Sequence, residues 1–209
     1  EAVVARYTTA LEQVQKDITV FLAEPDLKER VLEASKKFDS LSREQLAELR
    51  KRNDKLSKDA TELKQRQFDV LVGLYMTYKY ALKDVASDID EDAFSVAKKA
   101  LKRLLFREKE TTVAEQMMKA AYAGADAHSE YMTGKELEDL KNMMSTSFVG
   151  AGLGIIEGGH GIYINKVIEG GAAEENGVLQ TKDLITKVNG LETANMDAKA
   201  FRDQTVGEA

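Results

Sequence analysis

Hydrophobic residues recur at helical spacing through the first 123 residues and form short alternating runs in the rest of the chain. Glycine and proline follow the same division. Before residue 124 the chain has one proline, Pro25, and one glycine, Gly73, and the other 13 glycines lie from Gly124 onward. Both residues disfavour helix interiors, and clusters of glycine mark turns. The pattern therefore predicts an all-helical first part and a second part rich in strands and turns.

The helical part is predicted to begin with a long helix that Pro25 ends. Three more helix starts are marked by capping boxes, in which Ser42, Thr112 and Thr133 each precede a Gln or Glu by three residues. The very polar segment 50–64 is either an exposed helix or a connection. The helices expected are 2–23, 27–38, one from Ser42 through Leu49, 68–85, 91–107, 112–122 and a short one over 134–144.

The stretch from Ser147 to Val167 reads SFVGAGLGIIEGGHGIYINKV and predicts a β-hairpin, because apolar residues alternate on both sides of a turn at Gly158. Glycine weakens a strand unless the backbone must approach something closely or adopt a positive φ. Gly150, Gly152 and Gly154 therefore predict backbone amides exposed to a partner such as an anion. A flexible start of the hairpin explains the same glycines equally well.

Residues downstream of the hairpin predict a compact set of short elements. Gly177 is suited to end a helical turn at its C′ position, and Asn189-Gly190 is suited to a tight turn between strands. The expected elements are a helical turn over 172–176, a strand over 184–188 and a helix over 196–205 with Met196, Ala200 and Phe201 on one face.

Composition narrows the class of protein. Hydrophobic residues make up 43% and charged residues 32% of the 209 residues, as in a globular protein. The net charge of −6 argues against nucleic acid as the main partner, because binding phosphates needs clustered Lys and Arg. The basic pairs Lys51-Arg52, Lys98-Lys99 and Lys102-Arg103 are expected to lie on solvated helix faces.

Other classes are excluded by what the sequence lacks. It has no cysteine, which rules out disulfides and thiolate metal sites. It contains no run of about 18 apolar residues that would span a membrane. The opening EAVVARYTTA does not have the pattern of a signal peptide, so the protein is either cytosolic or has had a leader removed. His128 and His160 have no metal-binding spacing, and no cofactor or metal is expected.

From about Val149 to the end the sequence resembles a PDZ domain, on the glycine loop, the GGAAEENGV segment, the KDLI strand start, the VNG turn and the last helix. The junction just upstream resembles that of C-terminal processing (tail-specific) serine proteases. The residues that match this junction are Asp126, His128, Ser129, Tyr131, Phe148, Gly150 and Gly152. Three positions depart from the family: Ala127 and Ala172 replace prolines, and Lys182 replaces a glycine.

The expected fold class is α+β, with a helical domain over residues 1–146 followed by a PDZ-like domain over 147–209 that is truncated before its final strand. The resemblance implies a Ser-Lys catalytic pair on a further domain, so no catalytic residue is assigned in this chain, and whether the chain belongs to an enzyme stays open. The Ser95-x-x-Lys98 spacing is interpreted as chance. The resemblance also implies a periplasmic or cell-envelope location, or the lumen of a photosynthetic membrane.

A PDZ domain would imply a peptide that adds as a strand and ends in a carboxylate held by backbone amides. Amides of about Ala151 to Gly154 would bind the carboxylate, and strand residues Leu153 to Ile156 would pair with the peptide. Either Ala151-Gly152-Leu153 or Leu153-Gly154-Ile155 could be the carboxylate loop. The residues expected to bind the tail are Gly150, Ala151, Gly152, Leu153, Gly154, Ile155, Ala200 and Phe201.

The functional hypothesis is a fragment that binds apolar C-terminal tails of proteins and presents them to a protease domain. Two alternatives belong to other classes. The chain could be a non-catalytic adaptor whose helices dock a partner, or a structural protein that forms a homodimer through the helix over residues 2–21.

Overall fold

The computed structural model describes residues 2–38, 59–106, 113–125, 130–134, 136–137, 140–141 and 150–205. The chain forms two compact units, each made of two segments. The first comprises Glu1–Thr19 and Lys102–Val149, and the second comprises Val20–Leu101 and Gly150–Ala209. The domain boundary predicted at residues 146–147 lies outside the described residues and stays a prediction.

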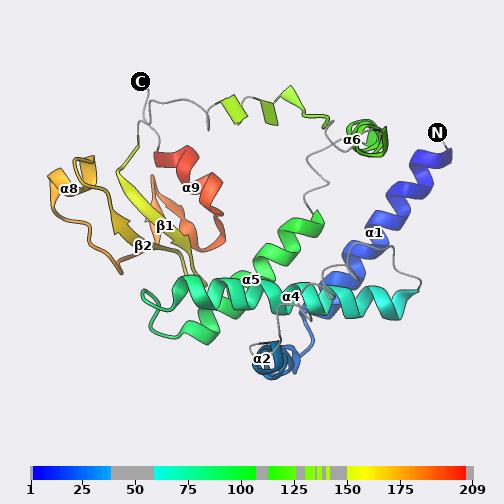
Figure 1. The fold of residues 1–209 in the computed structure, drawn as a ribbon, viewed down its shortest axis with the longest axis horizontal. Helices are drawn as coiled ribbons and strands as arrows, with labels where there is room; N and C mark the ends of the chain where they lie inside the picture. Colours follow the sequence, from blue (N-terminus) through cyan, green and yellow to red (C-terminus); the bar gives the residue numbers. More distant parts are fainter. Residues whose placement is uncertain are drawn as a thin grey trace. The chain divides into compact units, whose positions relative to one another are not determined.

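Five long helices are seen in the described part of the chain before residue 130 (Figure 1). They are α1 (Ala2–Leu22), α2 (Leu27–Phe38), α4 (Ala60–Leu82), α5 (Ile89–Phe106) and α6 (Val113–Ala125). The predicted helices over 2–23, 27–38 and 91–107 are confirmed, and the one over 112–122 corresponds to α6. The helix predicted from Ser42 lies outside the described residues.

The starts of α4 and α5 are fixed by aspartates placed before the first turn. Asp59 Oδ1 accepts a hydrogen bond from the Glu62 amide at 2.8 Å, and Asp88 Oδ1 accepts one from the Glu91 amide at 3.0 Å. Such side chains satisfy amides that have no partner within the helix. The Asp59 cap starts α4 well before the predicted residue 68, and the end of the polar segment 50–64 is therefore helical.

The helices of the second unit share an apolar core. Helix α2 packs on α4 and contributes Leu27 and Val31, both almost fully buried. Tyr75 of α4 is fully buried, and its hydroxyl donates to Asp90 Oδ1 at 2.6 Å. The buried residues of α4 and α5 include Leu71, Val72, Tyr75, Leu82, Ala93, Phe94, Val96, Ala97, Ala100 and Leu101.

In the first unit, the capping box at Thr133 is formed as predicted. The Glu136 amide donates to Thr133 Oγ1 at 3.3 Å, and Glu136 Oε2 accepts from the Thr133 amide at 2.9 Å. Residues 134, 136–137 and 140–141 of the expected short helix are helical. The hydrogen bond from Lys119, followed by those from Thr133, lowers the pKa of Glu136 to about 2.

The glycine-rich part of the second unit forms a small antiparallel sheet in the order β1-β2-β3. The hairpin of β1 (Leu153–Glu157) and β2 (Ile162–Val167) confirms the predicted one. Its register shifts between Gly154 and Ile155, which is the mark of a β-bulge. Tyr163 pairs with Leu184 of β3 (Leu184–Ile185).

The short elements after the hairpin largely follow the prediction. Helix α8 (Ala172–Asn176) ends at Gly177, whose φ of 71° is left-handed as expected. Asn189 and Gly190, with φ of 49° and 81°, turn the chain between β4 (Lys187–Val188) and β5 (Leu191–Glu192).

Two boundaries in this region were predicted wrongly. The single strand expected over 184–188 is divided into β3 and β4, because Thr193 bonds the chain at the division. Its hydroxyl donates to Ile185 O and its amide donates to Thr186 O. Thr193 opens the short 3-10 helix η2 (Thr193–Asn195), and α9 (Ala198–Thr205) begins two residues later than predicted because Asp197 caps it through the Ala200 amide.

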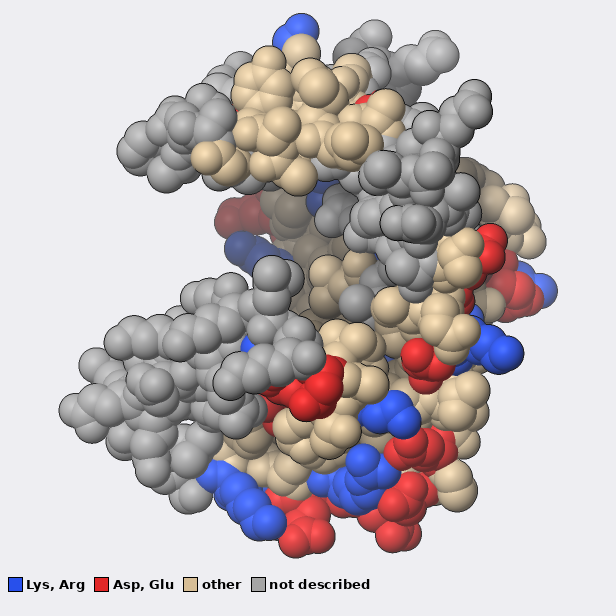
Figure 2. All heavy atoms as spheres, turned by 90° about the vertical axis from the view of Figure 1, so that its right-hand side faces the viewer, with Lys and Arg blue, Asp and Glu red and all other residues tan. Residues whose placement is uncertain are grey.

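Charges are mixed over the described surface. In the view of Figure 2, acidic and basic side chains of the described residues lie interspersed, with no large region of one sign. None of the described helices combines the length and the hydropathy that crossing a bilayer requires.

Candidate functional site

Strand β1 lies at an edge of the three-stranded sheet formed by the described residues. Side chains of directly paired residues point to the same face of a sheet. The register pairs Leu153 with Val167 and Ile155 with Ile164. Leu153 and Ile155 therefore share one face of the sheet, as the alternation in the sequence predicts.

Helix α9 lies beside β1 (Figure 1). The orientation is fixed by Glu157, whose Oε1 accepts a hydrogen bond from the Ala198 amide at 2.8 Å. Glu157 alternates with Leu153 and Ile155, so its contact with the start of α9 places the helix on the sheet face that carries these two apolar residues. An edge strand with a helix beside it is thus built from two segments about 40 residues apart in sequence.

Four of the residues expected to bind the tail, Leu153, Ile155, Ala200 and Phe201, differ in exposure. Leu153 and Ile155 are half-buried, and Ala200 is exposed. Phe201 is only 3% exposed, so most of its ring packs into the core beneath α9. The structure brings Leu153, Ile155 and α9 together, while the binding role of the four residues stays a prediction.

The glycine loop before β1 is held against α8. Gly152 has a φ of 71°, and a Cβ at this position would lie 2.9 Å from the Gly171 Cα. The carbonyl of Gly152 accepts from the Ile168 amide at 2.9 Å, and that of Ala151 accepts from the Ala173 amide at 3.0 Å. Both the conformation and the close backbone crossing require glycine at position 152. This loop is therefore fixed, unlike the flexible start that the sequence left open.

The tip of the hairpin is held by helix α5, a contact that the sequence did not predict. Asp92 is 3% exposed, and its Oδ1 accepts from the Gly159 amide at 2.7 Å. Its Oδ2 accepts from the Tyr163 hydroxyl at 2.8 Å. A Cβ on Gly159 would lie 2.6 Å from Asp92 Oδ1 and 3.2 Å from the Ser95 Cβ. The glycine therefore allows the hairpin tip to approach the helix.

Lys99 completes this contact from two turns further along α5. Its ammonium donates to the carbonyl of Gly159 at 2.7 Å and also to the carbonyl of Ala194. The prediction that the Lys98-Lys99 pair is solvated is therefore wrong for Lys99, which is half-buried. We call Asp92, Lys99, Gly159 and Tyr163 the α5 clamp.

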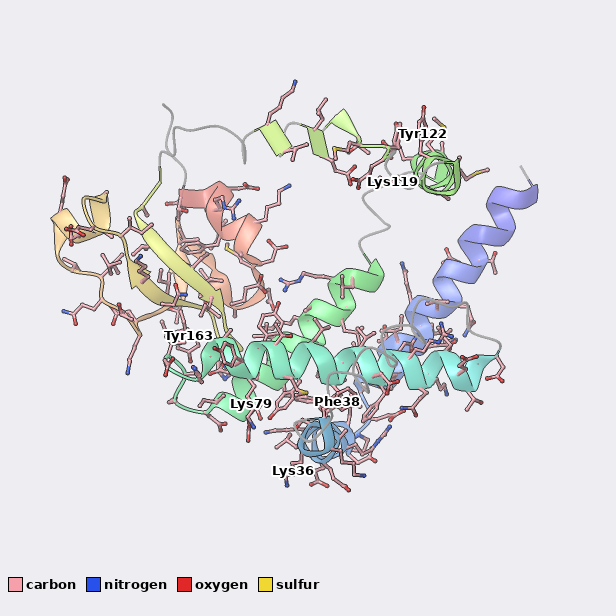
Figure 3. The ribbon with its side chains drawn as sticks, viewed as in Figure 1. Lys36, Phe38, Lys79, Lys119, Tyr122 and Tyr163 are labelled. Carbon is pink, nitrogen blue, oxygen red and sulfur yellow. The ribbon has the colours of Figure 1, made fainter. Side chains whose placement is uncertain are left out.

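The clamp alters the chemistry of Tyr163. Burial, and then the hydrogen bond to the Asp92 carboxylate, raise the pKa of Tyr163 to about 12. Figure 3 labels this side chain where the sheet meets the helices of the second unit. His160, between the buried glycines of the turn, is exposed.

Asp126, His128, Ser129 and Phe148 lie outside the described residues, and so does Ala127. The ring of Tyr131 lies 6.1 Å from that of Tyr122.

The Ser95-x-x-Lys98 pair gains no support as a catalytic site. The Lys98 ammonium lies over the Phe94 ring, 5.4 Å from its centroid. Within the described residues, no group of His, Asp and Glu could hold a metal ion.

Lys182 has a φ of 82°, at the position where the sequence departs from a family glycine. A left-handed conformation is the reason that glycine suits this position. Ala172 is the first residue of α8, where a proline would also fit a helix start.

Comparisons with known proteins agree with this architecture. The family model described as "PDZ domain" matches residues 139–208, so the chain contains a PDZ domain. A protein of Staphylococcus saprophyticus subsp. saprophyticus described as "Probable CtpA-like serine protease" is 37% identical over 102 residues. The aligned region covers 46% of this chain and 21% of that relative. The chain thus spans about a fifth of the length of the curated relative that it matches.

The two matches confirm the resemblance to C-terminal processing proteases that carry a PDZ domain. The described helices and antiparallel sheet, together with the PDZ match, confirm the α+β fold class.

Proposed function

We propose that this chain is the substrate-recognition part of a C-terminal processing serine protease and that it binds apolar C-terminal tails of proteins along β1. The observation that carries the proposal is the edge position of β1 beside α9. In this mode of recognition, backbone hydrogen bonds to an edge strand give affinity, and side-chain surfaces on alternate positions give specificity.

The local geometry supports the earlier of the two possible carboxylate loops. Strand pairing begins at Leu153, and the left-handed residue just before it is Gly152. In this register the amides from Ala151 to Leu153 would bind the carboxylate, and the last side chain of the tail would contact Leu153 and Ile155. Successive backbone amides in a turn that contains a left-handed residue are suited to bind an anion.

The link to proteolysis rests on the similarity to a relative that is a probable serine protease. In this proposal the chain supplies the tail-binding part, and catalysis depends on residues that this chain does not supply. The same similarity supports a location in the cell envelope or periplasm. An apolar binding surface would discriminate only weakly between aliphatic end residues.

Fluorescence-anisotropy titration of the 209-residue chain tests the proposal with one labelled pentapeptide ending in valine, prepared with a free carboxylate and with a C-terminal amide. Hydrogen bonds to a charged group contribute about 1.5–3 kcal/mol, so we expect the free acid to bind roughly tenfold tighter or more. Equal affinities for the two peptides would refute tail recognition.

A pair of glycine variants provides the matched control. Gly152→Ala should weaken binding of the free acid, because a Cβ would displace the loop from Gly171. Gly170→Ala introduces a similar left-handed alanine, at a φ of 73° with no atom within 4 Å of its Cβ, and should leave binding unchanged.

A further inference from the structure

The side chains of two polar residues of β2, Asn165 and Lys166, lie close to Gly154, the one glycine of β1. A Cβ placed on Gly154 would lie 2.6 Å from Asn165 Oδ1 and 3.0 Å from the Lys166 Cβ. Lys166 is the direct partner of Gly154 in the register, and Asn165 is the extra residue at the bulge. A β-bulge changes the direction in which nearby side chains point. Because Gly154 has no side chain, the Asn165 and Lys166 side chains occupy the space above it.

Lys166 is available to a ligand. Its side chain is exposed, and no hydrogen bond or ion pair involves it within the described residues. The Asp183 carboxylate, which precedes β3, accepts from the Gln180 amide at 2.8 Å, and no ion pair between Asp183 and Lys166 is found in the described part of the chain. The backbone of Lys182, another cationic residue, bonds to Ile164 O of the same strand at 2.8 Å.

From this arrangement we infer that Lys166 recognises an acidic side chain at the penultimate position of the bound tail. The inference rests on the proposed function and on the register in which the last residue of the tail lies opposite Leu153. The penultimate residue then lies opposite Gly154, and its side chain points to the face that carries Lys166 rather than to the face covered by α9.

The span is short enough for direct contact. Neighbouring strands are about 4.8 Å apart, so the backbone of the penultimate residue would lie about 10 Å from that of Lys166. The side chains of lysine and of aspartate or glutamate bridge this distance together, provided that nothing stands between them. Glycine at position 154 places no side chain of β1 on this path, and the exposed Asn165 side chain is the one group above it that has to turn aside. The tails expected are therefore apolar at the last residue and acidic at the one before it.

Free-acid pentapeptides that differ only at the penultimate residue test the inference, with Asp, Asn and Lys as the three probes. For a pair of exposed charges we expect the Asp peptide to bind roughly two- to fivefold tighter than the Asn peptide at low salt, and the ratio to shrink as salt rises. The Lys peptide should bind more weakly than the Asn peptide.

Variants of Lys166 attribute the preference to this side chain. In Lys166→Gln the ratio of Asp to Asn affinities should fall to about one, and in Lys166→Glu it should invert. Lys64→Gln removes another exposed positive charge, on α4, and should leave the ratio unchanged.

Three outcomes would overturn the inference, and they are distinguishable. A ratio that persists in Lys166→Gln, or an Asp peptide that binds no tighter than the Asn peptide to the unmodified chain, refutes the role of Lys166 while tail binding stands. If the free-acid and the amidated peptides bind with equal affinity, the proposed function and this inference are both refuted.

Discussion

Removal of the Asp92 carboxylate should release the tip of the hairpin from helix α5. Asp92 is 3% exposed and accepts two hydrogen bonds, one from the Gly159 amide and one from the Tyr163 hydroxyl. Asp92→Ala leaves both donors without this acceptor in a place where water has little access.

The expected loss of stability follows from the two donors that lose their acceptor. A buried donor that loses its acceptor costs about 1–3 kcal/mol, and part of this is returned because a buried charge is also removed. We therefore expect Asp92→Ala to lower the free energy of unfolding of this unit by about 2–4 kcal/mol. Asp92→Asn should cost only about 1 kcal/mol, because its amide oxygen still accepts from Gly159 and its NH2 can donate to the Tyr163 oxygen.

Hydrogen exchange of the Gly159 amide is the most local assay, and urea unfolding followed by circular dichroism gives the stability of the unit. Both variants are compared with Asp84→Ala, which removes an exposed carboxylate from the segment between α4 and α5 and should change stability by less than about 0.5 kcal/mol. Exchange at Gly159 should accelerate strongly in Asp92→Ala, weakly in Asp92→Asn and not in the control.

The reasoning fails if Asp92→Ala is no less stable than Asp84→Ala, or if exchange at Gly159 is unchanged. A cost as large for Asp92→Asn as for Asp92→Ala would also contradict it, since the asparagine keeps both hydrogen-bond partners.

Three further predictions concern the same unit. Gly152→Ala should destabilise it by about 2–4 kcal/mol, because a left-handed alanine adds to a clash with Gly171, whereas the open Gly170→Ala should cost about 1 kcal/mol in the same urea assay. Lys182→Gly should stabilise it by about 0.5–1 kcal/mol, because its φ of 82° strains a residue with a side chain; an unchanged or lower unfolding midpoint would contradict this. Tyr163 has a pKa of about 12 when folded and about 10 when unfolded, so the stabilisation of the folded state by its protonated hydroxyl is complete below pH 10 and is lost as the pH rises to about 12. The free energy of unfolding should therefore fall less over this pH range in Tyr163→Phe.

Much of the fold could be predicted because its signals are local. Helix periodicity, the stop at Pro25 and the capping box at Thr133 each depend on residues within one or two turns. The left-handed Gly177 and the Asn189-Gly190 turn are equally local, since only a few residue types adopt a positive φ readily.

The parts that the sequence did not predict depend on contacts between distant segments. The pattern of α5 gives no sign that Asp92 and Lys99 bond to Gly159, because charged residues on a helix are usually solvated. Three glycines in the turn at 158–161 do indicate a close approach, but their sequence cannot say which segment approaches. The division of the strand at Thr186 likewise depends on Thr193, seven residues away.

The candidate site was only partly predictable for the same reason. Alternation correctly grouped Leu153 with Ile155, and the glycine loop was correctly located. Gly152 is required by its contact with Gly171, however, so the glycines alone could not separate packing from anion binding. Phe201 was predicted to line a binding surface, yet a side chain that is 3% exposed has mainly a core role.

The central claim, that β1 binds the C-terminal carboxylate end of a peptide, is tested most directly by the backbone amide NMR shifts of the 209-residue chain during titration. Addition of a free-acid peptide should shift and protect the amides from Ala151 to Glu157, and the amidated peptide should produce much smaller changes. Shifts that spare this segment, or that are the same for both peptides, would contradict the account.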